Sequence, residues 1–147
     1  MKKFVCIAMT MMFSAVGAYA AEYTVEMKNN GTQGVMVFEP AVVKAKVGDT
    51  VHFVPTDPGH NTETLPGLIP STSKGWKSGF GEKISITLDA EGVYVYQCMP
   101  HAMMGMVGVI VAGKPTNLQD VVEKASSLTA KFVVHKDRLD KYLAQVK

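Results

Sequence analysis

The sequence predicts a mainly β fold, an antiparallel sandwich or barrel of six or seven short strands, followed by a short helical tail. Three observations support this prediction. Apolar and polar residues alternate with a period of two in segments such as residues 23–27. Other segments, such as residues 93–97, are rich in β-branched and aromatic side chains, which favour strands. Turn residues separate these segments at short intervals, as they do in sandwiches and barrels.

The strand segments follow one another along the first three quarters of the chain. They are residues 23–27, 35–38, 42–47, 50–54, 84–88, 93–97 and 107–111. Gly48-Asp49 and residues 89–92 are turn signals between them. Residues 55–81 have no such pattern and contain several prolines, so a long irregular stretch is expected there.

The chain changes character after Lys114-Pro115, where a helical pattern begins. Thr116 and Gln119 have the spacing of a capping box, which satisfies the free N–H groups of a first helical turn. One helical face then collects the apolar residues Leu118, Val121, Val122, Ala125 and Leu128. A second amphipathic helix is expected over residues 136–146. Both are short, so we expect a single domain over residues 21–147, with residues 114–147 docked on a sandwich of residues 21–113.

Residues 1–20 have the three parts of a secretory signal peptide, in the usual order. Lys2 and Lys3 come first, and residues 4–16 form an apolar stretch too short for a comfortable membrane span. Ala18-Tyr19-Ala20 then supplies small residues for signal peptidase, so we expect cleavage after Ala20 and export to the periplasm. An uncleaved membrane anchor is the alternative, and the polar segment that follows at once argues against it.

The charge of the exported chain is balanced. The full sequence has 15 Lys and Arg against 13 Asp and Glu, and the two lysines at its start leave with the signal peptide. The remaining 13 of each sign give no basic surface for nucleic acid or an anionic membrane.

Cys98 is the one cysteine of the exported chain, because Cys6 lies in the signal peptide. An internal disulfide is therefore excluded. A single thiol in an oxidising compartment persists when it is buried or when it binds a metal.

The segment after Gln97 contains further metal-binding side chains. Cys98, His101 and Met106 lie between two predicted strands, so the loop folds back and its two ends come close together. Pro100 and Gly105 suit a tight turn, one by fixing φ and the other by relaxing it. Thiolate and thioether are soft ligands, and two histidines, one cysteine and a weak axial methionine form the blue-copper ligand set.

The second imidazole has to come from elsewhere in the chain. His60 is the best candidate, since it follows an Asp-Pro-Gly turn at the end of a strand. His52 lies out of phase with the apolar residues of its strand and is expected to face solvent, and His135 lies in the helical tail. Asn61, beside His60, could connect the two loops and donate toward the Cys98 sulfur, although a simple turn residue is a fair rival reading. Met99, Met103 and Met104 are read as packing or surface residues.

These segments resemble the cupredoxins, and within them the pseudoazurin group. The similar segments are Val47-Gly48-Asp49-Thr50-Val51, Gly59-His60-Asn61 and Cys98-x-Pro100-His101-x-x-Met104-Gly105-Met106. The pair of C-terminal helices is similar as well, and the likeness covers nearly the whole exported chain. The resemblance implies an eight-stranded Greek-key sandwich that binds one copper ion at one end, with Met36 against the ring of His101 and Pro100 and Asn61 close to the ligands.

The resemblance also implies a function and partners. A periplasmic monomer would carry single electrons to a copper nitrite reductase, and would receive them from a cytochrome or another donor. The electron would leave through the exposed edge of His101, inside an apolar patch formed by Pro55, Pro100, Ala102 and Met104. Lys77, with Lys74 nearby, would steer an acidic partner. The ring of lysines is thinner than in many members, which carry lysine in place of Asn30, Pro58 and Gln97 and an aromatic residue in place of Ala102.

Two other functions are alternatives to electron transfer. A copper storage or delivery protein has some support from the methionine-rich loop, and it would hold copper in an open or Cu(I)-only site. An enzyme would need an open coordination position or a second metal site, and the sequence has no spare cluster of histidines.

Overall fold

The computed structural model describes residues 19–146, so the predicted signal peptide lies almost entirely outside the described residues. The described part contains eight strands, one 3₁₀ helix (η1) and two α-helices. Their bounds are β1 (Glu22–Gly31), β2 (Gly34–Glu39), β3 (Val42–Ala45), β4 (Thr50–Pro55), β5 (Glu63–Thr64), β6 (Ile84–Thr87), β7 (Gly92–Gln97), η1 (Met99–Met104), β8 (Val107–Ala112), α1 (Leu118–Thr129) and α2 (Arg138–Leu143). No helix within residues 19–146 has the length and apolar character needed to cross a membrane.

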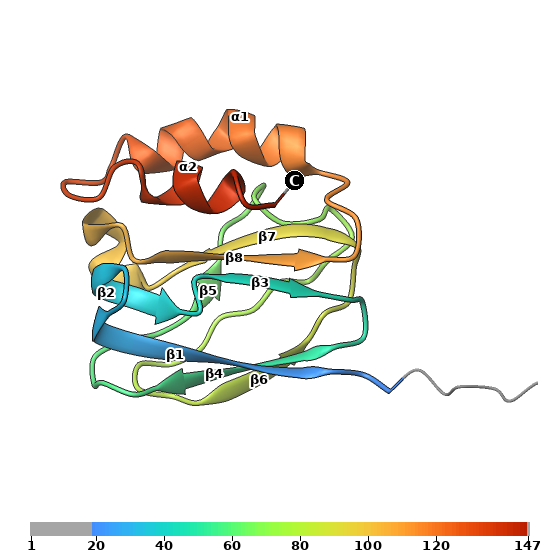
Figure 1. Cartoon of the computed structure of the whole chain (residues 1–147), viewed down its shortest axis with the longest axis horizontal. Coiled ribbons are helices and arrows are strands. Elements are labelled where there is room, and N and C mark those ends of the chain that lie inside the picture. The colour runs from blue at the N-terminus through green and yellow to red at the C-terminus, as the bar shows by residue number, and fades with distance from the viewer. Residues whose placement is uncertain (1–18, 147) are drawn as a thin grey trace, which may run out of the picture.

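The strands form two four-stranded sheets that face each other, with the orders β2-β1-β4-β6 and β3-β8-β7-β5 (Figure 1). The predicted sandwich of eight strands with two short helices is confirmed. Its antiparallel description is corrected at two places, because β1 runs parallel to β4 and β3 runs parallel to β8. The chain passes to the other sheet before β3 and returns after it. The pairs β1–β4 and β3–β8 are therefore not joined by a tight hairpin, which would require antiparallel strands.

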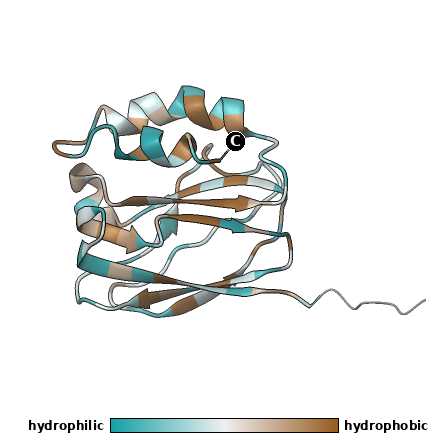
Figure 2. Ribbon diagram, in the orientation of Figure 1, coloured by the Kyte–Doolittle hydropathy of each residue, from teal (hydrophilic) through white to brown (hydrophobic). Residues whose placement is uncertain are grey.

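Two apolar layers hold the molecule together. The first lies between the sheets and includes the aromatic residues Phe38, Phe53, Tyr94 and Tyr96. The second lies between the sheet of β7 and β8 and the two helices, which cover its outer face (Figure 1). Because β8 is buried on both faces, its sequence is a nearly continuous run of apolar residues rather than an alternating one. Figure 2 shows that apolar stretch, and the mixed character of both helices.

The capping box predicted from Thr116 and Gln119 is wrong. The hydroxyl of Thr116 donates to the carbonyl of Glu91 at 3.2 Å, and the N-cap residue of α1 is Asn117. The Asn117 side chain bonds both main-chain groups of Val93, at 2.7 and 3.0 Å. Docking of the tail on β7 therefore replaces the local cap that the spacing suggested.

The two helices also differ in detail from their predicted extents. α1 buries Val121 and Ala125, but Val122 is 51% exposed and lies outside the buried face. α2 is shorter at both ends than the expected residues 136–146, although Val146 beyond it is still buried. β5 was not predicted: it consists of two residues and lies within residues 55–81, where an irregular stretch is expected.

The hairpin of β1 and β2 contains an ion pair whose contribution to the stability of the fold depends on pH. Lys28 Nζ lies 2.7 Å from Glu39 Oε2, and this contact, helped by Thr32, lowers the pKa of Glu39 to about 2. A carboxyl group whose pKa is lowered by folding stabilises the fold above its unfolded pKa, and that stabilisation disappears as pH falls toward the folded value.

We expect Glu39→Gln to lower the melting temperature slightly at pH 6 and to make no difference near pH 2. Thermal melts of both proteins between pH 6 and pH 2 measure this. Lys28→Met, which removes the partner of Glu39 and also a contact with Glu26 at 3.2 Å, should give a pH-dependent loss at least as large. A loss that stays constant across this range would mean that the ion pair is not its origin.

Candidate metal centre

Cys98, His101 and Met106 are brought together by the end of the β7–β8 ladder. The ladder continues one step beyond Gln97 and Val107, because the N–H of Cys98 donates to the carbonyl of Met106 at 3.0 Å. η1 fills the loop between them, and the N–H of Met106 donates to the carbonyl of His101 at 3.2 Å. Gly105 ends η1 with φ of 70°, a left-handed conformation that glycine adopts without strain.

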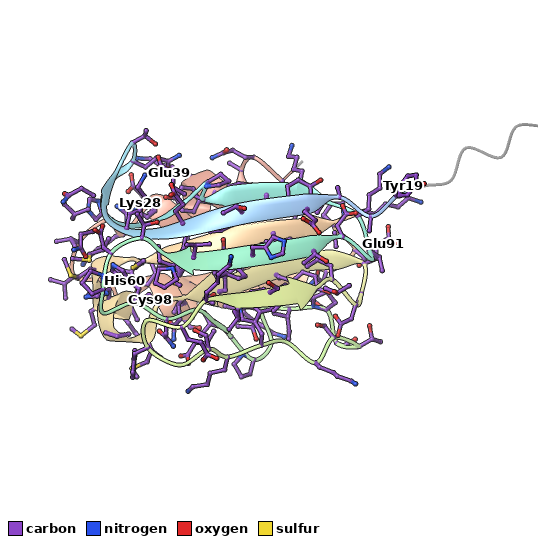
Figure 3. All side chains as sticks on the ribbon, turned by 90° about the horizontal axis from the view of Figure 1, so that it is seen from below. Tyr19, Lys28, Glu39, His60, Glu91 and Cys98 are labelled. Carbon is purple, nitrogen blue, oxygen red and sulfur yellow. The ribbon has the colours of Figure 1, made fainter. Side chains whose placement is uncertain are left out.

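His60 reaches the same place from the loop after β4. Its Nδ1 atom lies 3.1 Å from His101 Nδ1 and 3.6 Å from Cys98 Sγ, and Cys98 Sγ lies 3.4 Å from His101 Nδ1. These three donor atoms all fall within 4.8 Å of one another. His60 and Cys98 lie at the same end of the sandwich, opposite Tyr19 and Glu91 (Figure 3).

Burial differs among the predicted ligands. His60, Cys98 and Met106 are fully buried, whereas His101 is partly exposed. Met106 belongs to the apolar layer between the sheets, which also contains Cys98. Three of the predicted ligands are therefore shielded from solvent, and the imidazole of His101 is the ligand that extends toward it.

Asn29 orients the ring of His60, a role that no sequence pattern indicates. Its side-chain oxygen Oδ1 lies 3.0 Å from His60 Nε2. An amide oxygen only accepts hydrogen bonds, so Nε2 carries the proton and the lone pair of Nδ1 faces Cys98 and His101. Asn29 is itself held, because its N–H donates to Asp57 at 2.7 Å. A metal ligand whose second nitrogen is fixed in this way has a defined tautomer.

Burial makes both charged forms at the site unfavourable, the protonated imidazole of His60 and the thiolate of Cys98. Burial lowers the pKa of His60, and the neighbouring His101 lowers it further. Burial raises the pKa of the Cys98 thiol, an effect partly offset by N–H groups of Asn61 and His101 directed at the sulfur. Two imidazole nitrogens facing each other at 3.1 Å beside a thiol suit a soft metal ion that displaces the thiol proton.

Asn61 connects the two loops. Its Oδ1 accepts a hydrogen bond from the N–H of Met99 at 2.7 Å. The hydrogen bond that reaches the Cys98 sulfur comes from the main-chain N–H of Asn61 rather than from its side chain. Pro100 is exposed at the start of η1, next to the ligand loop.

The other two histidines lie outside the site. His52 sits on the outer face of β4, with Nδ1 2.7 Å from Ser85 Oγ. His135 lies in the loop between the helices, not within a helix, and its main chain packs close to Gly105. Met36 is half-buried against the apolar layer between the sheets, with a positive φ of 50°. Its contact with the ring of His101 stays a prediction.

The residues expected to contact a partner are not all at this end of the molecule. Ala102 and Met104 are half-exposed on η1, and Lys77 lies at the site end, paired with Glu63 at 3.0 Å. The expected position of Lys74 near Lys77 is corrected, because its main-chain N–H donates to Asp89 on the turn before β7, at the end of that strand away from Cys98. Its contact with a partner stays a prediction. The chain runs along the sandwich between residues 77 and 74, so the two lysines are not neighbours around the site.

Comparison with known proteins adds independent evidence. Residues 25–113 match the family described as copper binding proteins of the plastocyanin/azurin family. The pseudoazurin of Methylorubrum extorquens is 43% identical over 129 residues, which cover 88% of this chain and 84% of the relative. The pseudoazurin of Paracoccus pantotrophus is 39% identical, over 95% of this chain and 93% of its own length. This chain belongs to the pseudoazurin family.

The solved structures agree with that assignment. The crystal structure of native pseudoazurin from Hyphomicrobium denitrificans has a TM-score of 0.78 and 41% sequence identity, and the match covers 86% of this chain and 99% of that one. Pseudoazurins are electron-transfer cupredoxins and not enzymes, so the predicted copper cofactor is confirmed, and this chain is a copper-binding cupredoxin rather than an enzyme.

Proposed function

We propose that the protein is a soluble periplasmic electron carrier whose single copper ion is held by His60, Cys98, His101 and Met106. The observation that carries the proposal is the meeting of three soft or borderline donor atoms within 4.8 Å, in a buried position. When bound, the copper supplies a one-electron couple between Cu(I) and Cu(II). The predicted signal peptide, cut after Ala20, supports export.

The chain holds the ring of His60 and the two ends of the ligand loop before any metal arrives. Asn29 fixes the ring of His60, and the paired main chains of Cys98 and Met106 fix the ends of the loop. A site that does not rearrange when the charge changes has a low barrier to electron transfer. With two imidazoles, a thiolate and a thioether around it, the site has no open position for a substrate.

The electron has a short route to the surface through His101. This ring is the partly exposed member of the set, and η1 surrounds it with the half-exposed Ala102 and Met104. Pro100 is exposed on the same loop, and Pro55 is half-exposed at the end of β4. An apolar surface of this kind suits brief contact with a redox partner, because it releases water without requiring strict charge pairing.

We propose a copper nitrite reductase as the electron acceptor and a cytochrome or a similar protein as the donor, on the basis of the pseudoazurin resemblance. Lys77 is 71% exposed and is the lysine placed to attract an acidic acceptor. Its ion pair with Glu63 neutralises part of that attraction, which agrees with a thin lysine ring.

Lys77→Gln should slow the reduction of an acidic nitrite reductase by about two- to fivefold at low ionic strength, because steering by surface charge acts on the association rate. Stopped-flow mixing of the reduced carrier with the reductase measures this rate. The difference should disappear above about 0.3 M salt, where the screening length becomes short.

Lys114→Gln is the matched control for the lysine effect. Lys114 follows β8 at the end of the sandwich where Glu91 lies, so its loss should leave the rate unchanged. An equal effect of both substitutions would show that net charge, not the position of Lys77, controls the rate.

A copper storage or delivery protein is the second candidate function. Met99 and Met103 favour it, since these residues are 46% and 61% exposed on η1, next to the site, and a thioether is a soft ligand that could pass Cu(I) inward. A carrier keeps its copper through oxidation and reduction, whereas a delivery protein releases it to an acceptor.

One titration decides between the two functions. The purified protein without residues 1–20 receives one equivalent of Cu(II), then a mild reductant, then an oxidant, in the presence of a Cu(I) chelator. An intense blue band that bleaches and returns in full supports the carrier. Loss of copper to the chelator at the reduced stage, or a pale band throughout, would contradict the carrier function and support the delivery function.

A further inference from the structure

Arg138 is a buried cation with an unusual set of partners. It is the first residue of α2, and only 5% of it is exposed. A buried charge usually requires a carboxylate partner. Among residues 19–146, however, the ion pairs within 4.0 Å do not include Arg138. Its guanidinium is satisfied by main-chain carbonyl groups instead.

Those carbonyls belong to two segments that are distant in sequence. Nη1 donates to Met36 at 2.9 Å and to Gly105 at 3.0 Å. Nη2 donates to Val35 at 3.1 Å and to Gln33 at 3.3 Å. One side chain from the helical tail therefore joins the β1–β2 hairpin to the end of the ligand loop.

Gly105 is the residue directly before Met106. The peptide group between them is held on both sides, because Arg138 binds its oxygen and the carbonyl of His101 accepts its N–H at 3.2 Å. The position of this peptide sets the start of the Met106 side chain. In a blue-copper site the distance of the axial methionine tunes the potential.

Met36 shows a similar constraint. Its φ of 50° is unfavourable for a residue with a long side chain, and such a conformation persists when its surroundings fix it. The hydrogen bond from Nη1 to the Met36 carbonyl is one such constraint. The same nitrogen thus holds the main chain of both β2 and the ligand loop.

The loop before Arg138 reinforces this contact. The N–H of Val133 donates to the carbonyl of Met103 at 2.7 Å. A Cβ atom on Gly105 would lie 3.3 Å from the carbonyl oxygen of His135, so the loop packs directly on that glycine. The tail contacts the second half of the ligand loop at two successive points.

We propose that Arg138 is a positioning residue of the copper site: its hydrogen bond to Gly105 sets how closely Met106 approaches the metal, and its bond to Met36 ties the β1–β2 hairpin to the same point. This inference rests on the proposed copper ligands. It assigns to the helical tail a role in redox tuning as well as in packing.

Two substitutions separate hydrogen bonding from charge. Arg138→Met keeps an unbranched stem without donors, and Arg138→Lys keeps the charge but loses the planar fork that serves four carbonyls. Both should change the ratio of the intense blue band to the weaker band at shorter wavelength, and the electron paramagnetic resonance spectrum of the Cu(II) form. Both should also change the Cu(II)/Cu(I) equilibrium by about threefold to tenfold, where tenfold is about 59 mV for one electron.

Leu139→Ala is the matched control. Leu139 is the next residue on α2, is fully buried, and packs in the layer between the helices and the sheet. It should lower the melting temperature at least as much as the arginine variants and leave the spectra and potential unchanged. Hydrogen exchange in the metal-free protein adds a second readout, since the Met106 amide should exchange faster in Arg138→Lys and keep its wild-type rate in Leu139→Ala.

The outcomes differ clearly. Wild-type spectra, potential and Met106 exchange in both arginine variants would overturn the proposal, as would equal changes in Leu139→Ala. A change in Arg138→Met but not in Arg138→Lys would assign the effect to charge and reject positioning by hydrogen bonds. If Arg138→Met fails to fold, the lysine variant alone decides. A wild-type protein without a blue band would refute the copper-carrier proposal instead.

Discussion

Replacing Cys98 with serine is expected to remove the intense blue absorption completely. The band arises from charge transfer between a thiolate and Cu(II), and a serine hydroxyl stays protonated and is a poor ligand for copper. The Cys98 side chain is fully buried beside His60 and His101. Among residues 19–146 it is the one cysteine, so no other thiol in that part of the chain can replace it. The absorption spectrum after addition of one equivalent of Cu(II) measures the effect.

His52→Gln provides the control for this substitution. It removes an imidazole from the outer face of β4, bonded to Ser85, and should leave the blue band intact. His60→Gln should weaken or abolish the band. A blue spectrum that survives Cys98→Ser would take Cys98 out of the proposed ligand set.

A large loss of stability is expected for Gly108→Ala. Gly108 lies directly opposite Tyr96 in the β7–β8 ladder, and the Tyr96 ring leans across it. A Cβ atom at Gly108 would lie 2.4 Å from this ring, which Phe38 and Phe53 hold at centroid distances of 4.8 and 5.0 Å. Forcing such a contact costs about 2–3 kcal/mol and lowers the melting temperature by roughly 10 °C.

Gly48→Ala separates this clash from backbone strain. Gly48 has a φ of 92°, but an added Cβ atom would meet nothing within 4 Å. Its cost is therefore only that of the left-handed conformation, about 1 kcal/mol. Melting curves of both metal-free variants compare the two costs, and a Gly108→Ala protein as stable as Gly48→Ala would show that the Tyr96 ring moves aside freely.

Local sequence signals were sufficient for most of the fold. The seven predicted strands each carry alternation or β-branched residues, and those signals depend on a residue and its near neighbours. β5 has only two residues, Glu63 and Thr64, and exists because it pairs with β7. The parallel pairing of β1 with β4 likewise depends on which sheet the chain enters next, and no local pattern encodes that choice.

The candidate site divides in the same way. Cys98, His101 and Met106 lie within nine consecutive residues, so their spacing was readable. Asn29 and Arg138 were not identifiable, because each acts on a residue at least 31 positions away. The one available signal at Asn29 is a polar residue with low strand preference inside β1. Arg138 reads as an ordinary solvent-facing helical residue until its burial is known.

The helical tail covers a face of the sandwich that could not remain bare. β7 and β8 direct Val93, Val95, Val107, Val109 and Val111 toward the helices, and all five are at most 5% exposed. In a chain that ends after Gly113 these valines would form an exposed apolar patch on the sheet, and a patch of this kind drives aggregation. The sandwich therefore needs residues 114–146 to keep this face out of water, and we expect a chain that ends at Gly113 to aggregate even though every strand is present.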